Sequence, residues 1–207
     1  MTSAQPTIDY SRVGVVIPVK AFDQAKERLS DLLTPAERIA LTKYCAEQVI
    51  RAAEKFETFV VCDDPQVAQW ARALSTQVVW QPEIGLNLAV RAGVEVAKSR
   101  GKTLAIVSHS DLPLATDFAA LLVGQTGELL NSSVTLVPDR HHDGTNIIVL
   151  PTDSGFEFRY GKHSFDAHQQ MAKKLGLQTR VLDDANLAVD IDTAEDLAFA
   201  QKLKNLG

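Results

Sequence analysis

The chain has 207 residues, a formal net charge of −5 and 45% hydrophobic residues, a composition typical of a globular domain that excludes extensive disorder. An acidic pI of about 5.5 argues against general binding to nucleic acids or anionic membranes, because a net negative surface repels both. The two cysteines, Cys45 and Cys62, are too few for a disulfide framework or a cysteine-rich zinc site. The sequence contains neither a signal-peptide pattern nor an apolar run of membrane-spanning length, so we expect a cytoplasmic protein.

Buried strands alternate with amphipathic helices in the first half of the chain. The apolar run Val13–Val19 does not alternate with polar residues, which predicts a strand buried on both faces. Thr34-Pro35-Ala36-Glu37 is typical of a helix start, because Thr can cap the helix and Glu can complete a capping box. The elements expected after this helix are Phe59–Cys62, Gln66–Leu74, Gln77–Trp80, Asn87–Arg100 and Thr103–Ser108.

The second half of the chain interrupts this alternation. Strands expected at Ser133–Val137 and Asn146–Leu150 have no helix between them, which predicts a mixed sheet with an antiparallel strand or ribbon. The remaining expected elements are helices at Leu114–Val123, Phe165–Leu175 and Thr193–Leu203 and short strands at Thr179–Leu182 and Ala188–Ile191. The sequence therefore predicts one α/β domain over residues 1–207, a three-layer sandwich with a mixed, mostly parallel sheet. Residues 1–11 are expected to form a flexible tail.

Acidic side chains follow several of the predicted strands. Ligands bind beyond the carboxyl ends of the strands in open α/β sheets, and carboxylates are ligands that Mg²⁺ prefers. Asp111 follows a strand of the first half, and Asp190 and Asp192 lie at the end of the last predicted strand. We interpret Asp111 and Asp190 as the better Mg²⁺ ligands, because Asp192 also begins a helix-capping pattern with Glu195. Asp64, which precedes a proline, is interpreted as a helix cap.

Basic side chains follow the first predicted strand. Lys20 comes directly after it, and Lys26 and Arg28 follow within the next eight residues. A cationic loop at the edge of a sheet suits a polyphosphate, although such residues are commonly only a solvated helix face. The sequence contains no Gly-rich phosphate loop of the P-loop or dinucleotide type, which argues against a P-loop kinase and a nicotinamide-dependent dehydrogenase.

Two polar segments of the second half predict an anion-binding site. Thr145 and Asn146 enter a strand from a polar turn, and Gly161 precedes a helix that Ser164 is expected to cap. The free N–H groups of a helix N-terminus, with a hydroxyl beside them, suit a phosphate or a carboxylate. The alternative is that Ser164 only caps the helix and Gly161 only turns the chain.

These segments, taken together, carry a family resemblance. They are Ile17-Pro18-Val19-Lys20, Ala25-Lys26, Arg28-Leu29, Glu37-Arg38, Gly85-Leu86-Asn87, Asp111-Leu112-Pro113, Pro138-Asp139-Arg140, Asp143-Gly144-Thr145-Asn146, Tyr160-Gly161, Ser164-Phe165, His168, Asp190-Ile191-Asp192-Thr193 and Glu195-Asp196-Leu197. In this order they resemble the CofC/FbiD family, the guanylyltransferases of coenzyme F420 biosynthesis that act on phosphorylated three-carbon acids. Two places depart from the family pattern: Ala194 replaces a frequent proline, and Ser108-His109-Ser110 replaces more apolar or Gly-like residues.

The resemblance implies a nucleotidyltransferase fold of the MobA-like, glycosyltransferase-A-like type. The implied reaction transfers GMP from GTP to the phosphate of 2-phospho-L-lactate, phosphoenolpyruvate or 3-phosphoglycerate and releases diphosphate. The same resemblance implies a catalytic role for Lys20, Lys26 and Asp111. It implies nucleotide binding by Lys20, Lys26, Arg28, Gly85, Leu86 and Asn87, and acceptor binding by Thr145, Asn146, Gly161 and Ser164. It implies Mg²⁺ binding by Asp111, Asp190 and Asp192. It also allows a homodimer and a contact with a downstream transferase of F420 biosynthesis.

This chemistry needs no side-chain nucleophile. The second pKa of a phosphate is about 6, so the acceptor phosphate is largely ionised at neutral pH. The protein must align two polyanions and offset their repulsion, which lysines and Mg²⁺ can do. Two alternatives stay open from the sequence: a catalytically silent nucleotide- or phosphate-binding protein on the same fold, and a nucleotidyltransferase for another acceptor, such as a sugar or a molybdopterin.

Overall fold

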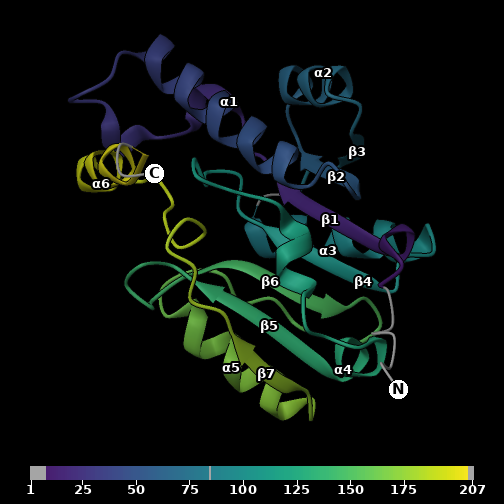
Figure 1. Cartoon of the computed structure of the whole chain (residues 1–207). Coiled ribbons are helices and arrows are strands. Elements are labelled where there is room, and N and C mark those ends of the chain that lie inside the picture. The colour runs from purple at the N-terminus through teal and green to yellow at the C-terminus, as the bar shows by residue number, and fades with distance from the viewer. Residues whose placement is uncertain (1–7, 84, 205–207) are drawn as a thin grey trace.

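A seven-stranded sheet in the order β3-β2-β1-β4-β6-β5-β7 runs through the protein (Figure 1). The computed structural model describes residues 8–83 and 85–204. The strands are β1 (Val13–Pro18), β2 (Glu57–Cys62), β3 (Gln77–Trp80), β4 (Leu104–Ser108), β5 (Ser133–Pro138), β6 (Thr145–Pro151) and β7 (Gln178–Val181). β6 is antiparallel to both of its neighbours, and the other strand pairs are parallel. The mixed, mostly parallel sheet is therefore confirmed.

Helices cover both faces of this sheet. The α-helices are α1 (Pro35–Ala52), α2 (Pro65–Ala73), α3 (Leu86–Ser99), α4 (Gly127–Ser132), α5 (Ser164–Lys174) and α6 (Ala194–Lys204), and the 3-10 helices are η1 (Tyr10–Arg12), η2 (Phe22–Gln24), η3 (Glu27–Leu29) and η4 (Phe118–Leu122). Successive residues of a strand point to opposite faces, so Ile17 belongs to the core cluster that contains residues of α1, α2 and η4, whereas Val16 belongs to the cluster that contains residues of α3 and α5. Three layers result, as predicted.

The C-terminal segment packs in a separate small cluster with η3 and α1. Ala200 of α6 lies with Leu29 of η3 and Cys45 of α1 in a small cluster of buried side chains. Val189 and Ile191, from the segment that leads into α6, complete this cluster. In Figure 1 α6 accordingly lies beside the purple segment that precedes α1. This packing brings the end of the chain against the loop that follows β1.

Two helix starts were predicted correctly from the sequence. The Thr34 hydroxyl accepts from the N–H of Glu37, and the Glu37 carboxylate accepts from the N–H of Thr34, so the capping box is present. Asp64 caps α2 by accepting from the N–H groups of Gln66 and Val67, both at 2.9 Å. Its carboxylate is therefore used within the fold.

Two expectations about secondary structure were wrong, and one short helix was not predicted. The predicted strand Ala188–Ile191 is irregular, because its apolar side chains enter the cluster beneath α6 instead of pairing in the sheet. The predicted helix Leu114–Val123 is reduced to η4, which Asp117 caps by accepting from the N–H of Ala119. The short helix α4, capped by Thr126, was not predicted.

The N-terminal tail lies only partly within the described residues. Residues 1–7, the first part of the predicted tail, lie outside them. Asp9 caps η1, and the Tyr10 ring contacts Phe56 with 5.1 Å between ring centroids. Among the described residues no helix is long and apolar enough to cross a membrane.

Candidate active site

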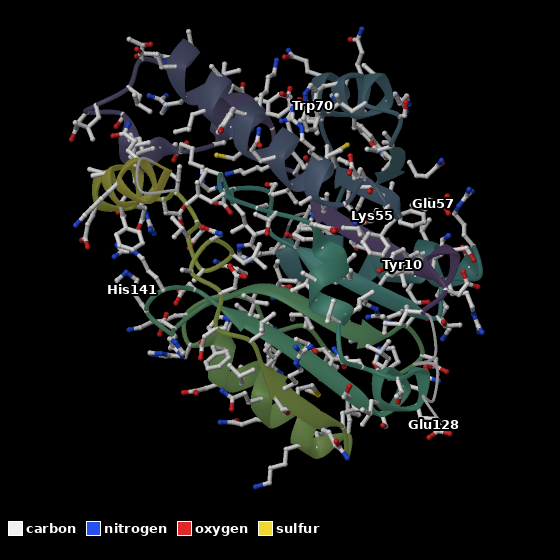
Figure 2. The ribbon with its side chains drawn as sticks, viewed as in Figure 1. Tyr10, Lys55, Glu57, Trp70, Glu128 and His141 are labelled. Carbon is white, nitrogen blue, oxygen red and sulfur yellow. The ribbon has the colours of Figure 1, made fainter. Side chains whose placement is uncertain are left out.

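The candidate site lies at the edge where β1, β4 and β5 end. These strands run in the same direction, because β6 is antiparallel to both β4 and β5. Figure 2 shows His141 just beyond the end of β5, and Glu128 of α4 at the opposite end of this strand. The edge marked by His141 is the one where ligands bind in open α/β sheets.

A buried lysine joins two carboxylates at this edge. The Lys26 ammonium donates to Asp111 Oδ2 at 2.6 Å and to Asp192 Oδ1 at 3.4 Å. Its side chain is only 4% exposed. Lys26 precedes η3, Asp111 follows β4, and Asp192 precedes α6, so three segments far apart in the sequence meet here. The structure thus brings together three of the predicted site residues.

Lys26 and Asp111 each stabilise the charged form of the other. Burial would raise the pKa of Asp111, but the Lys26 ammonium and the neighbouring His109 hold it below its usual range. Burial would lower the pKa of Lys26, but Asp111 and Asp192 hold it above its usual range. Both groups are therefore charged at neutral pH. Asp111 Oδ1 is buried and has no hydrogen-bond partner among the described residues.

Asp190 lies close enough to Asp111 and Asp192 for their charges to affect its pKa. Burial and the nearby Asp111 carboxylate raise the pKa of Asp190 to about 6. Burial disfavours a charge on this carboxyl, and the Asp111 carboxylate repels a second negative charge. The N–H of Ile191 donates to the Asp111 carbonyl at 3.2 Å, which ties the segment of Asp190 to the end of β4. A cation placed here would be stabilised by Asp111, Asp190 and Asp192 together.

The residues present suit Mg²⁺ better than a closed metal centre. Among the described residues there is no group of three or more His, Cys, Asp or Glu side chains arranged to hold a metal. Mg²⁺ is commonly bound through one or two carboxylates together with substrate phosphates. The orphaned Asp111 Oδ1 and the neighbouring carboxylates fit that requirement. In the structure the Lys26 ammonium supplies the positive charge between Asp111 and Asp192.

The residues predicted to bind the nucleotide follow β1 and β3, on one side of β4 in the sheet. Lys20 and Arg28 are exposed beyond β1. Gly85 precedes α3 with a φ of 127°, a conformation that favours glycine, and the neighbouring Leu86 is 38% exposed. The side chain of Asn87 accepts from the N–H of Tyr160 at 2.7 Å and donates to its carbonyl at 3.4 Å. Asn87 therefore connects the start of α3 to the segment before α5.

The residues predicted to bind the acceptor lie around β6 and the start of α5. The buried Thr145 hydroxyl lies 3.0 Å from His168 Nδ1, and Asn146 donates to the Leu187 carbonyl at 3.0 Å. Gly161 has a φ of 132°, and no atom lies within 4 Å of the position that a Cβ would take. Ser164 is buried as the first residue of α5.

Two predicted helix caps were wrong. His163, not Ser164, is the N-cap of α5, and it makes no side-chain capping hydrogen bond. At α6 the capping box joins Thr193 to Asp196, one residue later than the predicted Asp192 pattern. The Asp196 carboxylate caps with one oxygen and binds Arg140 with the other. Asp192 is consequently free of a capping function and its carboxylate contacts Lys26.

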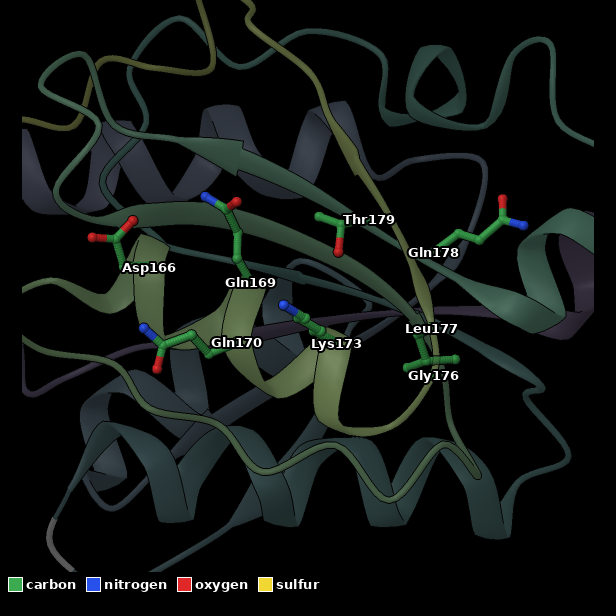
Figure 3. A pocket seen from close by; sticks show the side chains of 8 residues that line it. All are labelled: Asp166, Gln169, Gln170, Lys173, Gly176, Leu177, Gln178 and Thr179. Carbon is green, nitrogen blue, oxygen red and sulfur yellow. The ribbon is translucent and has the colours of Figure 1, made fainter.

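A groove elsewhere on the surface contains none of the predicted site residues. It has a volume of about 610 Å³ and lies between α5 and β7. Figure 3 shows polar side chains lining it, and its lining consists of Asp166, Gln169, Gln170, Lys173, Gly176, Leu177, Gln178 and Thr179. Because it lacks a buried charge cluster, we place the site at the carboxylates instead.

The sequence analysis named three ring-bearing residues, His109, Tyr160 and His168, without assigning a role to them. The His109 ring lies 5.2 Å from that of Tyr160, and the Tyr160 ring lies 4.9 Å from that of His168. His109 Nε2 and the Tyr160 hydroxyl are buried without a hydrogen-bond partner among the described residues. The signal for His109 was its departure from the family pattern directly before Asp111.

Solved structures of known proteins share this architecture. A nucleotidyl transferase from Methanothermobacter thermautotrophicus matches with a TM-score of 0.64 at 14% identity, over 95% of this chain and 99% of that one. A CMP:2-keto-3-deoxy-manno-octonic acid synthetase complexed with CTP matches with a TM-score of 0.63 at 15% identity, over 95% and 99%. The fold is therefore of the nucleotidyltransferase type.

Sequence comparison places the chain within one branch of this class. A family model described as "Guanylyl transferase CofC like" matches residues 13–200, and the chain belongs to this family of nucleotidyltransferases. A phosphoenolpyruvate guanylyltransferase from Rubrobacter xylanophilus is 36% identical over 90% of this chain and 92% of its own length. A 2-phospho-L-lactate guanylyltransferase from Methanocaldococcus jannaschii is 27% identical over 90% of this chain and 81% of its own length.

Proposed function

We propose that this protein transfers GMP from GTP to the phosphate of a three-carbon phospho-acid and releases diphosphate. The observation that carries the proposal is the contact of the buried Lys26 with Asp111 and with the half-exposed Asp192 at the sheet edge of a CofC-like chain. Phosphoenolpyruvate is the first acceptor to test, because relatives at 36% and 34% identity carry the name phosphoenolpyruvate guanylyltransferase. 2-Phospho-L-lactate and 3-phosphoglycerate are the comparison acceptors.

The proposed step forms one bond and breaks one. An acceptor phosphate oxygen attacks the α-phosphorus of GTP and forms a new P–O–P linkage. The bond between the α-phosphorus and the oxygen that bridges it to the β-phosphorus breaks, and diphosphate leaves with that electron pair. Because the attacking phosphate is ionised, no side chain has to remove a proton. The protein's task is to align the reactants and to stabilise negative charge.

Mg²⁺ would be held by Asp111 and Asp190, with Asp192 as a further carboxylate. When bound, the ion would supply charge neutralisation for the reacting phosphates. Lys26 is already charged and buried beside these carboxylates. Lys26 would act together with the exposed Lys20 to stabilise the phosphates of the nucleotide.

The two substrates would bind on opposite sides of the carboxylates. We assign Lys20, Arg28 and the start of α3, with Gly85, Leu86 and Asn87, to GTP. We assign Thr145, Asn146, Gly161 and Ser164 to the acceptor. The side chain of Asn87 already bonds to the backbone of Tyr160, so in this assignment it connects the two sides rather than contacting guanine.

The cellular setting is part of the proposal. The family resemblance supports a place in coenzyme F420 biosynthesis, in which a downstream transferase would consume the guanylylated product. It also supports a cytoplasmic enzyme, with a homodimer as its candidate assembly. The assembly is tested by measuring the molar mass of the purified protein in solution.

An acceptor panel tests the proposed reaction. The purified chain is incubated with Mg²⁺, with GTP or CTP, and with each of the three acceptors, and products are identified by mass. We expect diphosphate release and a GMP adduct with GTP and one three-carbon phospho-acid, and loss of both when EDTA is added. A GMP adduct only with a sugar phosphate or a pterin would overturn the acceptor class. Nucleotide binding without any product would identify a catalytically silent binding protein.

A further inference from the structure

The segment that carries Asp190 and Asp192 belongs to no helix or strand. It lies between β7 and α6, so a regular ladder of backbone hydrogen bonds does not fix it. Two backbone contacts hold its first part: the N–H of Arg140 donates to the Ala188 carbonyl at 2.9 Å, and the N–H of Ile191 donates to the Asp111 carbonyl at 3.2 Å. The position of its last part depends on side chains.

The Asp196 carboxylate holds the last part of this segment. Its Oδ2 accepts from the N–H of Asp192 at 3.2 Å and from the N–H and hydroxyl of Thr193, both at 2.8 Å. The side chain is 11% exposed, so water competes little for these hydrogen bonds. The backbone of Asp192 is therefore fixed by a carboxylate of α6, four residues further along the chain.

The second oxygen of the same carboxylate belongs to Arg140. Asp196 Oδ1 accepts from Arg140 Nε at 3.1 Å and from Arg140 Nη2 at 2.8 Å. The guanidinium also lies over the Phe199 ring, 5.3 Å from its centroid. A planar guanidinium with two donors on one oxygen restricts the rotation of the carboxylate. Arg140 consequently sets the direction in which Asp196 presents its other oxygen to Asp192.

We propose that Arg140 and Asp196 are positioning residues for the metal-binding carboxylates. Arg140 holds the segment twice, through its backbone N–H at Ala188 and through Asp196 at Asp192. The side chain of Asp192 then lies where it contacts Lys26 beside Asp111. This inference rests on the proposed function, because it assumes that these carboxylates bind Mg²⁺.

Charge and positioning make opposite predictions for Arg140. Removing a positive charge from the neighbourhood of three carboxylates would strengthen the attraction of a divalent cation. Removing a residue that orients the ligands weakens metal binding, and losses of about 10- to 100-fold are usual for such residues. The sign of the change in metal affinity therefore separates the two effects.

The test measures metal binding to the full chain without substrates. Mn²⁺ alone, in place of Mg²⁺, is titrated into each protein, and the free ion is measured by electron paramagnetic resonance. Arg140→Met keeps an apolar stem over Phe199 and removes the guanidinium, and Arg140→Lys keeps the charge without the planar donors. Glu195→Gln is the matched control, because Glu195 contacts the same guanidinium at 3.1 Å from an exposed position.

We expect Arg140→Met to weaken Mn²⁺ binding about tenfold, Arg140→Lys to weaken it less, and Glu195→Gln to stay within about twofold of the unchanged protein. Affinity that is equal or tighter in Arg140→Met, with a lower melting temperature, would limit Arg140 to anchoring α6. If Arg140→Met does not fold, Arg140→Lys decides by the same comparison. If the Arg140 variants bind Mn²⁺ as tightly as the unchanged protein, and the unchanged protein transfers GMP, this inference is overturned and the proposed function stands. If the unchanged chain neither binds Mn²⁺ nor transfers GMP, the proposed function is overturned together with it.

Discussion

Lys26 combines a buried charge with a strained backbone. Its φ of 59° lies in the left-handed region, which costs a non-glycine residue on the order of 1–3 kcal/mol. The ammonium is held there by Asp111 Oδ2 and Asp192 Oδ1. A divalent cation that approaches Asp111 Oδ2 must therefore compete with an ammonium already in contact with that oxygen.

Lys26→Met should make the protein more responsive to Mg²⁺. Without the ammonium, Asp111 Oδ2 and Asp192 Oδ1 are free to bind the ion, whereas in the unchanged protein the ion competes with Lys26 for these oxygens. We expect a larger rise of the melting temperature with added Mg²⁺ in Lys26→Met than in the unchanged chain, measured by calorimetry without nucleotide. Lys55→Met, which breaks an exposed ion pair with Asp117, is the control and should respond as the unchanged protein does. An equal response in all three proteins would show that Lys26 and Mg²⁺ do not compete.

Asp111→Asn should abolish GMP transfer while the chain stays folded. The amide keeps the shape of the side chain but loses the charge that pairs with Lys26 and suits a metal ligand. We expect kcat to fall on the order of a hundredfold or more, since even residues that only support metal ligands cost about 10- to 100-fold. Asp64→Asn is the matched control: Asp64 also follows a strand but caps α2, and Asn caps equally well. A near-normal rate of Asp111→Asn at saturating Mg²⁺ would contradict the assignment.

At the start of α6 capping and the proposed metal binding belong to different residues. Asp192–Glu195 and Thr193–Asp196 both match the capping pattern in the sequence. In the structure the second pair forms the capping box, and the other oxygen of Asp196 binds Arg140. A local pattern could not reveal this choice, because Arg140 lies 56 residues away from Asp196.

Variants at Thr193 and at Asp192 should therefore affect different properties. Thr193→Ala removes the hydroxyl that accepts from the N–H of Asp196, and we expect it to lower the free energy of unfolding by about 1 kcal/mol. Asp192→Asn should leave the unfolding midpoint in denaturant unchanged and lower the rate of GMP transfer. A loss of stability in Asp192→Asn with an unchanged rate would return Asp192 to a capping function.

His168 connects α5 to its surroundings in the neutral form. Nε2 accepts from the N–H of Arg159 at 2.9 Å, so Nδ1 carries the proton toward the Thr145 hydroxyl. Burial lowers the pKa of His168 to about 4. The unfolded chain, with a His pKa of about 6.5, therefore takes up this proton first as the pH falls.

The stability that His168 contributes should be complete above about pH 6.5 and lost as the pH falls toward 4. The shift corresponds to roughly 3 kcal/mol at most. We expect the difference in unfolding free energy between the unchanged protein and His168→Gln to shrink over this interval, measured in urea at several pH values. A difference that is constant with pH would show that His168 titrates normally in the folded chain.

Elements with a strong local signal were predicted, and elements set by distant contacts were not. The apolar runs of β1, β2 and β4 and the capped start of α1 follow from adjacent residues. The segment before α6 has the apolar content of a strand, but Val189 and Ile191 pack against Leu29 and Cys45. Such contacts depend on how the finished layers meet, which no local pattern contains.

The strand order of the whole molecule separates the two predicted halves of the site. Lys26 and Gly85 follow strands β1 and β3 on one side of β4, and Thr145 begins β6 on the other side. Asp111 follows β4, between the two halves. The family resemblance identified the residues, but the contact of Lys26 with Asp111 and Asp192 spans 85 and 166 residues and follows only from the assembled sheet.

Because the two halves of the site are separate, a substitution at Gly161 should change the KM for one substrate more than the KM for the other. A Cβ at Gly161 meets no protein atom within 4 Å, so the space beside it is open to an acceptor. Gly161→Ala should raise the KM for the phospho-acid more than the KM for GTP, because the methyl group narrows the acceptor side. Gly155→Ala is the matched control, since Gly155 also has a positive φ and open space and follows the turn after β6. Both variants should lose stability, by about 1 kcal/mol or more, because alanine disfavours these conformations.

Steady-state kinetics with each substrate varied in turn measures both KM values. Equal increases in the two KM values would indicate general damage to the fold, and an increase confined to the KM for GTP would move Gly161 to the nucleotide side.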